Sequence, residues 1–290
     1  MRIAILGVSG MLGNVVFRLL SDTTDHTVFG TARSGDVRRF FEPKLAGNVV
    51  AGVDVEHLDA LVGALQTIRP DVVVNCIGIV KQLSTARDPL TAIPVNSILP
   101  HRLARLCELI GARLIHISTD CVFSGRGGLY RESDPPDAED LYGRSKLLGE
   151  PECDNAITLR TSIIGRELES RNGLVDWFLH ETGSVRGFTR ALFSGLTTDE
   201  LTRVIARHVL PRPDLKGVYH VGADPISKYD LLTIIKDTYG LPVSIEVDTA
   251  VVIDRSLDSS RFRKASGYAP PSWPELVRHM REFQQRKSRS

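Results

Sequence analysis

The sequence predicts an α/β fold built on a doubly wound parallel sheet, with a small α/β lobe toward the C-terminus. A short β-rich run, residues 2–6, is followed by a glycine turn and then by an apolar-periodic helix. The nearly continuous apolar run 71–78 suits a central parallel strand buried on both faces. Strand-like and helical segments alternate to about residue 160, as repeated β-α units require. These features are typical of a Rossmann-type sheet.

Length, composition and charge set the broad limits. The chain has 290 residues, of which 42% are hydrophobic and 24% are charged, enough for one large core and a smaller second lobe. A net charge of +1 gives no field that would gather nucleic acid or an anionic membrane, so neither partner is expected. No segment has the length of a transmembrane helix or the pattern of a signal peptide.

The cysteines bear on the redox compartment. The chain has four of them: Cys76, Cys107, Cys121 and Cys153. They stand far apart without C-x-x-C spacing, which argues against a zinc site or a disulfide framework and favours a reducing, cytoplasmic location. The histidines do not form a spaced ligand set either, so no metal is predicted.

The first candidate site is the glycine turn 7–13, which precedes the apolar-periodic helix. Glycines at G-x-x-G-x-x-G spacing allow a tight turn, close approach of a pyrophosphate and close packing of helix on strand. The helix N-terminus adds free N–H donors and a positive dipole. Many loops contain such glycines by chance, so the context decides. The candidate cofactor-binding residues are Gly7, Ser9, Gly10, Met11, Leu12 and Gly13.

The second predicted strand, 26–32, ends at Arg33, where an acidic residue would hold the ribose hydroxyls of NAD. An arginine can instead pair with a 2′-phosphate, so NADP is the preferred cofactor and NAD is the alternative. A solvated arginine without a ligand is the simpler interpretation. A third strand, 49–53, places Asp54 and Val55 at the adenine edge.

A fourth strand lies within 71–78, after an amphipathic helix over 58–68, and its end opens at the ligand edge of the sheet. The cofactor-binding candidates there are Cys76, Ile77 and Gly78. A long helix is expected over 91–110 despite Pro94 and Pro100, and it carries Asn96. Because a buried asparagine is costly unless its hydrogen bonds are satisfied, Asn96 has a structural role at least, and a place beside the nicotinamide is the functional alternative.

A fifth strand, 113–117, delivers Thr119 and Asp120 to the same edge. These groups can hydrogen-bond a substrate carbonyl, although hydroxyl residues also commonly cap strand ends. Tyr142 and Lys146 are four residues apart in a segment that reads as helix, so they share one face. The lysine is expected to lower the pKa of the phenol toward neutrality and make it a usable proton donor or acceptor. For this pair alone, an amphipathic helix with a surface lysine is the simpler alternative.

Four segments together resemble the extended short-chain dehydrogenase/reductases, and among them the dTDP-4-dehydrorhamnose reductase-like proteins that act on nucleotide sugars. They are 7–13, Ser118-Thr119-Asp120-Cys121-Val122-Phe123, 142–150 and Leu159-Arg160-Thr161-Ser162, in family order. The resemblance covers nearly the whole chain. It extends to the regulatory subunit of methionine adenosyltransferase, which keeps this fold in a regulatory role.

The resemblance implies a set of catalytic and binding residues. Tyr142 would donate a proton to the substrate carbonyl oxygen, and the nicotinamide would supply the hydride. Lys146 would bind the nicotinamide ribose and tune Tyr142, while Thr119 would hydrogen-bond the reacting oxygen. Asp120 would lie at the sugar.

Two residues depart from the family pattern. Cys121 stands where the reductases usually carry tyrosine, and Ile163 stands where they usually carry tryptophan after Arg-Thr-Ser. In the family both positions lie near the sugar, so these changes bear on the choice of substrate more than on the fold. Cys121 also argues against a nucleotide-sugar 4,6-dehydratase, which usually has glutamate there, because a thiol with a pKa near ~8.5 is a poor substitute for that acid.

The remainder of the chain is expected to form a mainly substrate-binding lobe, 161–290, beside a dinucleotide-binding domain, 1–160, with segments near 190–222 returning to the latter. The expected elements are helices over 172–180, 198–209 and 228–239, the last capped by Ser227, and a main-sheet strand over 217–222. Arg190, in an expected loop 186–195, and Arg255, in a strand-to-loop segment 253–258, are candidates to bind the substrate diphosphate. Exposed arginine is the alternative for Arg190.

These observations predict an NADP-dependent reductase of a keto group on a nucleotide-activated sugar, in surface-polysaccharide biosynthesis by family analogy. A nucleotide-sugar epimerase with the same residues is one alternative. A non-catalytic NADP-binding regulatory protein of the same fold is the other. A homodimer is compatible with the sequence, which does not fix the base, the sugar or the carbon that is reduced.

Overall fold

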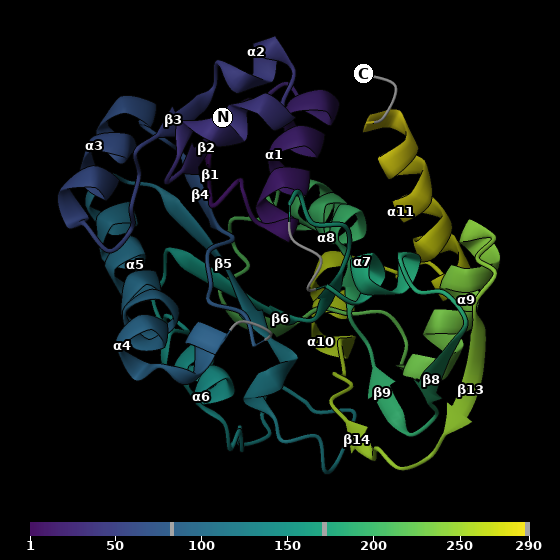
Figure 1. The fold of residues 1–290 in the computed structure, drawn as a ribbon. Coiled ribbons are helices and arrows are strands. Elements are labelled where there is room, and N and C mark those ends of the chain that lie inside the picture. The colour runs from purple at the N-terminus through teal and green to yellow at the C-terminus, as the bar shows by residue number, and fades with distance from the viewer. Residues whose placement is uncertain (82–83, 170–172, 288–290) are drawn as a thin grey trace.

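The computed structural model describes residues 1–81, 84–169 and 173–287. Within these ranges, the centre of the fold is a parallel seven-stranded sheet in the order β11-β6-β5-β4-β1-β2-β3. The strands are β1 (Arg2–Leu6), β2 (Thr27–Ala32), β3 (Val49–Ala51), β4 (Val72–Asn75), β5 (Arg113–Thr119), β6 (Ala156–Thr161) and β11 (Gly217–His220). The order reverses beside β1, so the doubly wound sheet that the sequence predicts is confirmed (Figure 1).

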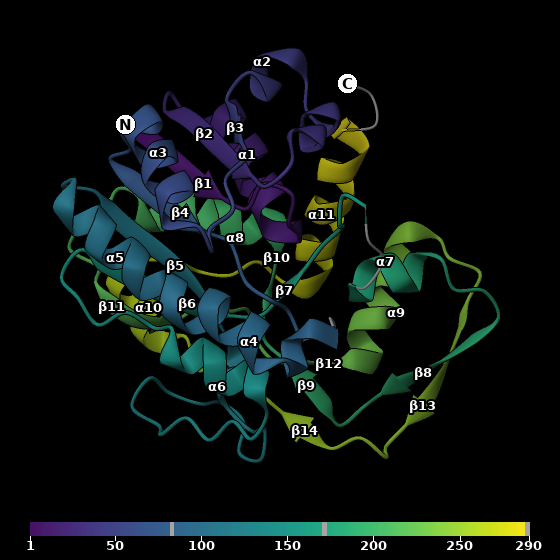
Figure 2. The ribbon, with the colours of Figure 1, turned by 60° about the vertical axis from the view of Figure 1, so that its left-hand side comes forward.

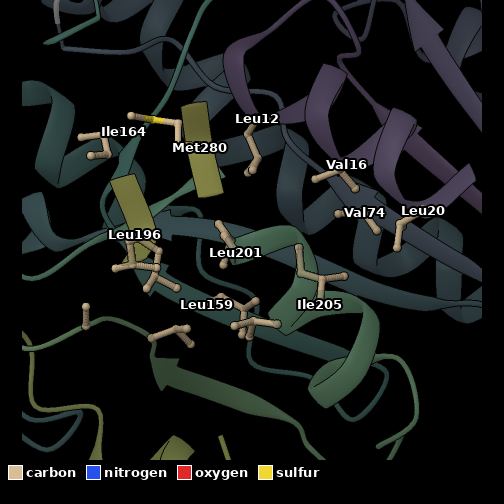
Figure 3. Packing of buried hydrophobic residues seen from close by; sticks show 14 of the residues in the cluster. Leu12, Val16, Leu20, Val74, Leu159, Ile164, Leu196, Leu201, Ile205 and Met280 are labelled. Carbon is tan, nitrogen blue, oxygen red and sulfur yellow. The ribbon is translucent and has the colours of Figure 1, made fainter. Parts of the chain in front are cut away.

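Helices cover both faces of this sheet because successive side chains of a strand point to opposite sides. Ile3 and Ile5 of β1 join the core cluster of α1 and α8, whereas Leu6 joins that of α3 and α5. Figure 1 shows α3 and α5 on one side of the sheet and α1 and α8 on the other, and Figure 3 shows the packing in the first cluster. These helices are α1 (Met11–Thr23), α3 (Leu58–Ile68), α5 (Leu99–Leu109) and α8 (Thr198–Val204).

The long helix expected over 91–110 forms in three joined parts. The α-helical turn α4 (Pro89–Ala92) leads into a π-helical stretch, Ile93–Ile98, which continues as α5. Prolines lack the N–H that an α-helix needs, and the wider π turn accommodates Pro94 because the N–H of Leu99 donates to its carbonyl. The predicted helix 198–209 likewise continues from α8 into a π-helical turn, Ile205–Val209.

The described residues of the C-terminal lobe contain three small sheets, one of which pairs β7 (Ile163–Ile164) with β10 (Leu196–Thr197). β8 (Ser184–Phe188) pairs with β13 (Ser244–Asp248), and β9 (Ala191–Phe193) lies between β12 (Ile226–Ser227) and β14 (Ile253–Asp254). Figure 2 shows β8 and β13 side by side at the outer edge of this lobe. Helix α6 spans Leu141–Leu148. The remaining elements are α2 (Pro43–Ala46), α7 (Leu174–Leu179), α9 (Lys228–Tyr239), α10 (Ser260–Ser266), α11 (Trp273–Lys287) and short 3₁₀ turns at Gly35–Phe40, Ser84–Arg87 and Asp120–Val122.

One expectation for this lobe is wrong. The segment 186–195 is not a loop, because most of it belongs to β8 and β9. Val185 and Gly187 of β8 are buried, Ser184 and Arg186 are exposed and Phe188 is half-buried. All five residues pair with β13, so alternation and pairing fix an extended strand. The expected helix 172–180 is present from Leu174, and residue 172 lies outside the described residues.

Two glycine-to-alanine substitutions are expected to change stability in opposite directions. A Cβ on Gly13 would lie 2.1 Å from the carbonyl oxygen of Gly7, so Gly13→Ala must move backbone and is expected to lower the free energy of unfolding by about 1–3 kcal/mol. A Cβ on Gly63, inside α3, would meet nothing within 4 Å, so Gly63→Ala is expected to raise it by about 0.5–1 kcal/mol. Urea denaturation of both variants checks the contrast, and equal effects would show that the turn does not pack as described.

Candidate active site

The glycine turn joins β1 to α1 and leaves room for a ligand at its middle glycine. Gly7 has a φ of 84°, the left-handed region that favours glycine, and Gly13 packs against it. By contrast, a Cβ on Gly10 would approach nothing closer than 3.4 Å, so the chain's own packing does not require a glycine there. The N-terminal N–H groups of α1 follow directly, at Met11 and Leu12. This arrangement fits a pyrophosphate that approaches the backbone at Gly10.

The end of β2 presents exposed basic side chains to the same edge. Arg33 is exposed directly after the strand, and Arg38 follows in the next turn. Ser34 caps that turn by accepting a hydrogen bond from the N–H of Asp36. Val55 is buried in the α3 side of the core, while Asp54 is half-buried and accepts the N–H of Glu56. Arg33 is therefore free to meet an anionic group beside the turn.

The loop after β4 connects the cofactor side to the catalytic side. Asn75 accepts the N–H of Ile77 at 3.1 Å, which sets the course of the chain as it leaves the sheet. A Cβ on Gly78 would lie 3.4 Å from Oδ1 of Asn96 and 3.9 Å from Nζ of Lys146. Cys76, at the start of this loop, has a pKa raised to about 12 by burial, so it stays a neutral thiol. The structure therefore brings the three residues Gly78, Asn96 and Lys146 together.

Asn96 is buried and its amide joins three segments. It accepts the N–H of Ile79 at 2.9 Å and donates to the carbonyl of Ile79 at 3.1 Å and to Oγ of Ser145 at 3.2 Å. The structural role expected for this residue is thus fulfilled, since it fastens the loop after β4 to the helix that carries Tyr142 and Lys146. Its place near the nicotinamide stays a prediction.

Helix α6 is held tightly at both ends. Asp140 caps it by accepting the N–H of Gly143 at 2.7 Å. A Cβ on Gly143 would lie 2.2 Å from the carbonyl oxygen of Cys121, and one on Gly149 would lie 1.9 Å from that of Asn96. Only glycine allows these approaches, so the two contacts fix the position of the helix between the end of β5 and the π-helical stretch.

Tyr142 and Lys146 share the face of α6 that meets the end of β5, as the spacing predicts. Nζ of Lys146 donates to the carbonyl of Ile117 at 2.7 Å, and the Thr119 side chain is near enough to Tyr142 to lower the pKa of its phenol. The hydroxyl, the phenol and the ammonium that the sequence places at this edge therefore lie together, next to Gly78.

The expected direction of the Tyr142 pKa is wrong. Burial raises it, and the nearby Cys121 adds to the rise more than Thr119 offsets it. Burial also lowers the pKa of Lys146 to about 8, opposed by the negative charge of Glu150. The desolvation cost of a phenolate is the largest cause, and the phenol stays protonated near neutral pH. This is the form that a proton donor needs.

Beyond Tyr142, charges of both signs gather around Asp120. Asp120 is buried, which raises its pKa, while Arg255 and Lys228 act in the opposite direction. The adjacent Cys121 has a pKa raised to about 12 by burial and by Asp120. The thiol is therefore neutral, and the two cations face one carboxyl group at the mouth of the site.

The segment around Arg255 is fastened to the loop that follows β5. Nε of Arg255 donates to the carbonyl of Phe123 at 2.8 Å, and the N–H of Asp254 donates to the carbonyl of Gly125 at 2.7 Å. These bonds place the Arg255 guanidinium where it acts on Asp120 and Cys121. Arg255 thus lies against the loop that follows β5, and its contact with a substrate diphosphate stays a prediction.

The other predicted arginine is placed differently. Arg190 lies exposed in the tight turn between β8 and β9, and its side chain makes no hydrogen bond or ion pair within the described residues. The neighbouring Arg186 pairs instead with Asp248, at 3.4 Å. Ile163, which departs from the family pattern, lies in β7 and packs against the main core. A diphosphate contact for Arg190 stays a prediction.

Sequence reasoning missed two features of the site. The first is a buried ion pair behind Lys146, in which Arg160 donates to both carboxylate oxygens of Glu150, at 2.9 and 2.7 Å, while Ser118 donates to the same carboxylate at 2.6 Å. The second is Lys228, the first residue of α9 after its Ser227 cap. A lysine is unfavourable at the positive end of a helix dipole, and this conflict is a signal that could have identified it.

Within its described residues the structure contains neither a metal-ligand cluster nor a membrane-spanning helix. Within the described residues, no group of three or more His, Cys, Asp or Glu side chains is placed to hold a metal ion. No helix in residues 1–81, 84–169 or 173–287 is both long and apolar enough to cross a membrane.

Comparisons with known proteins agree with the fold. The chain is 33% identical over 273 residues to the probable low-salt glycan biosynthesis reductase Agl14 of Haloferax volcanii, covering 90% of this chain and 87% of that protein. It is 30% identical over 257 residues to methionine adenosyltransferase 2 subunit beta of Danio rerio, covering 84% and 75%. A crystal structure described as a hypothetical dTDP-4-dehydrorhamnose reductase from Sulfolobus tokodaii is 27% identical, with a TM-score of 0.75 and coverage of 94% and 98%.

The family assignment rests on nearly the whole chain. The described fold has a parallel sheet with a glycine turn after its first strand and a Tyr-x-x-x-Lys helix packed against β5. Residues 1–282 match the family described as the RmlD substrate binding domain. The chain therefore belongs to the RmlD substrate binding domain family.

Proposed function

We propose that this protein is an NADP-dependent reductase that converts a keto group on a nucleotide-activated sugar to an alcohol. The observation that carries the proposal is the gathering of Thr119, Tyr142 and Lys146 beside Gly78, at the edge where the glycine turn opens. The similarity to a glycan biosynthesis reductase and to a dTDP-4-dehydrorhamnose reductase structure supports the same reaction class.

Each residue has its own role in the proposed reaction. NADPH, when bound, supplies the hydride. Tyr142 holds a proton at Oη, because burial keeps its pKa raised, and gives it to the oxygen of the substrate carbonyl. Thr119 orients that oxygen through its hydroxyl. Lys146 stays anchored to the carbonyl of Ile117, which points its ammonium along the face where the cofactor ribose would lie.

The direct test is NADPH consumption with keto derivatives of dTDP-, UDP- and GDP-linked sugars. Steady, stoichiometric loss of NADPH absorbance with one of them supports the reductase. A nucleotide-sugar epimerase would instead recycle its cofactor, so substrate conversion without net NADPH consumption would favour the epimerase and overturn the reductase.

A regulatory role is the second candidate, because the chain is 30% identical to a methionine adenosyltransferase subunit beta. The assembled Thr119, Tyr142 and Lys146 cluster favours chemistry, since a purely regulatory protein does not need a buried proton donor. Binding of NADPH together with failure to reduce any keto sugar nucleotide would favour the regulatory reading. A shift in thermal stability measures that binding whether or not catalysis follows.

Arg33 is expected to set the preference for NADPH over NADH. Arg33→Ala removes an exposed guanidinium at the end of β2, where a 2′-phosphate would lie. The KM for NADPH is expected to rise about tenfold, as the loss of one charge-assisted contact implies, while the KM for NADH stays unchanged. Steady-state kinetics with each cofactor checks this, and equal changes for both would contradict a 2′-phosphate contact. Arg126→Ala, which removes an exposed arginine paired with Glu139, is the control.

We also propose a homodimer, formed through a groove of α5 and α6. Ile98, Leu106 and Leu148 line this groove, and Leu148 is 65% exposed although it is a large apolar side chain. Leu148→Glu is expected to shift the molecular mass measured by light scattering from two chains to one. An unchanged mass would contradict this interface.

We also expect the protein to work in the reducing cytoplasm. The four cysteines are all free, as this location requires.

A further inference from the structure

Lys228 is a half-buried cation without a polar partner. It begins α9, directly after β12, and in the described part of the chain its ammonium forms no hydrogen bond or ion pair. The ammonium lies over the ring of Phe193, whose centroid is 4.2 Å from Nζ. Burial lowers the pKa of Lys228, and Asp120 and Cys121 are the nearby groups that oppose this change. A cation held in this way, at the unfavourable end of a helix, needs a reason that packing does not supply.

The small sheet of the C-terminal lobe explains the position of Lys228. β12 pairs antiparallel and β14 pairs parallel with β9, and Ser227 and Asp254 both lie opposite Leu192, one on each side of β9. Lys228 follows β12 and Arg255 follows β14, and both act on the charge of Asp120. Arg255 is fixed by its bond to Phe123, whereas the ammonium of Lys228 rests on the aromatic ring alone.

Lys228 and Asp120 are close enough to influence each other's charge, yet they do not form an ion pair. Asp120 already receives the hydroxyl of Thr119 at 3.1 Å. A group that fits between an ammonium and a carboxyl must accept a hydrogen bond from the first and donate one to the second. A hydroxyl does both, since its oxygen accepts and its hydrogen donates.

Resting on the proposed reductase function, we propose that Lys228 determines substrate specificity by binding, jointly with Asp120, a ring hydroxyl next to the carbon that is reduced. The neighbouring Thr119 and Tyr142 hold the reacting oxygen, so the bridged hydroxyl belongs to an adjacent ring position. Sugars that lack this hydroxyl leave the Lys228 ammonium and the Asp120 carboxyl without their shared partner and are rejected. Lys228 thus recognises the substrate, while Tyr142 performs the proton transfer.

The test replaces Lys228 by methionine, which matches its length without the charge, and by arginine, which keeps the charge. Lys228→Met is expected to lower kcat/KM for the keto sugar nucleotide by about 30- to 100-fold, chiefly through KM, and to leave NADPH affinity unchanged. Lys228→Arg is expected to restore part of the loss. Lys236→Met, on the same helix, is the matched control and is expected to behave as the wild type. Unchanged kcat/KM in Lys228→Met would overturn the inference.

A double-mutant cycle tests the shared hydroxyl. If Lys228 and Asp120 bind the same group, the losses in Lys228→Met and Asp120→Asn will not add in the double variant. Additive losses would show two separate contacts and overturn the bridge. A panel of monodeoxy sugar nucleotides adds a second readout, because one analogue is expected to bind the wild type poorly while Lys228→Met no longer distinguishes it from the parent sugar.

Calorimetric binding of dTDP-glucose, UDP-glucose and GDP-mannose separates this inference from the reductase proposal. A wild type that binds one of these alcohols more tightly than Lys228→Met, yet reduces no keto sugar, would retain Lys228 as a recognition residue and remove the reductase function. A wild type that reduces a keto sugar, but no faster than Lys228→Met does, would retain the reductase function and remove Lys228 as a recognition residue. A wild type that binds none of these probes and reduces no keto sugar would overturn both.

Discussion

Tyr142→Phe is expected to lower kcat for keto-sugar reduction by about 10³-fold, the middle of the range for the loss of a general acid. The substitution removes one hydroxyl from a side chain packed between α6 and the end of β5, and it leaves the anchors of α6 at Gly143 and Gly149 untouched. The affinity for NADPH is therefore expected to stay within about twofold of the wild type. Single-turnover kinetics with NADPH absorbance measures the chemical step without product release.

Tyr229→Phe is the matched control, because Tyr229 is a half-buried tyrosine of α9 that lies against Gly187 of β8 and has no place in the proposed chemistry. It is expected to retain wild-type kcat. A Tyr142→Phe variant that keeps its kcat would show that another group protonates the product. A variant that loses NADPH binding as well would show that the phenol holds the cofactor.

Glu150→Gln is expected to lower the free energy of unfolding by about 3–5 kcal/mol, because breaking one side of a buried ion pair leaves the other charge uncompensated. The side chains of Arg160 and Glu150 are only 6% and 5% exposed, and the pair is bidentate. Glutamine keeps the shape but loses the negative charge that faces the Arg160 guanidinium. The midpoint of urea denaturation is therefore expected to fall, with an unchanged slope.

Glu152→Gln provides the comparison, since Glu152 is exposed two residues further along the chain and its loss is expected to change stability by less than about 0.5 kcal/mol. The same Glu150→Gln variant makes a second, independent prediction. Glu150 raises the pKa of Lys146 against the effect of burial, so its removal lowers that pKa further, and the alkaline limb of the pH–rate profile moves to lower pH. Similar stability of Glu150→Gln and Glu152→Gln would contradict the stabilising role of the buried Arg160–Glu150 ion pair.

The sheet was predictable because its strands carry strong local patterns. The apolar runs 2–6 and 71–78, the glycine turn and the Tyr-Lys spacing each identify an element without knowledge of its neighbours, and all of them lie where the sequence places them. The strand 217–222 also joins the main sheet as expected, although it comes after much of the second lobe. These are the segments in which local pattern and tertiary position agree.

The features that the sequence did not predict depend on contacts between distant segments. The segment 186–195 reads as a loop because its glycines and arginines break the apolar pattern, and only pairing with β13, about 60 residues later, extends it into a strand. The raised pKa of Tyr142 depends on burial by the end of β5 and on Cys121, which the spacing from Lys146 cannot show. Lys228 meets Asp120 only through the β12-β9-β14 sheet.

The most direct test of the central claim is hydride tracing with NADPH that carries deuterium at the transferable position of its nicotinamide. Incubation with a keto sugar nucleotide, followed by mass spectrometry of the product alcohol, is expected to show one deuterium on the former carbonyl carbon for each NADPH consumed. The Tyr142→Phe variant should slow this transfer without changing its destination. A converted sugar that carries no deuterium, with the cofactor recovered unchanged, would contradict reduction by this site.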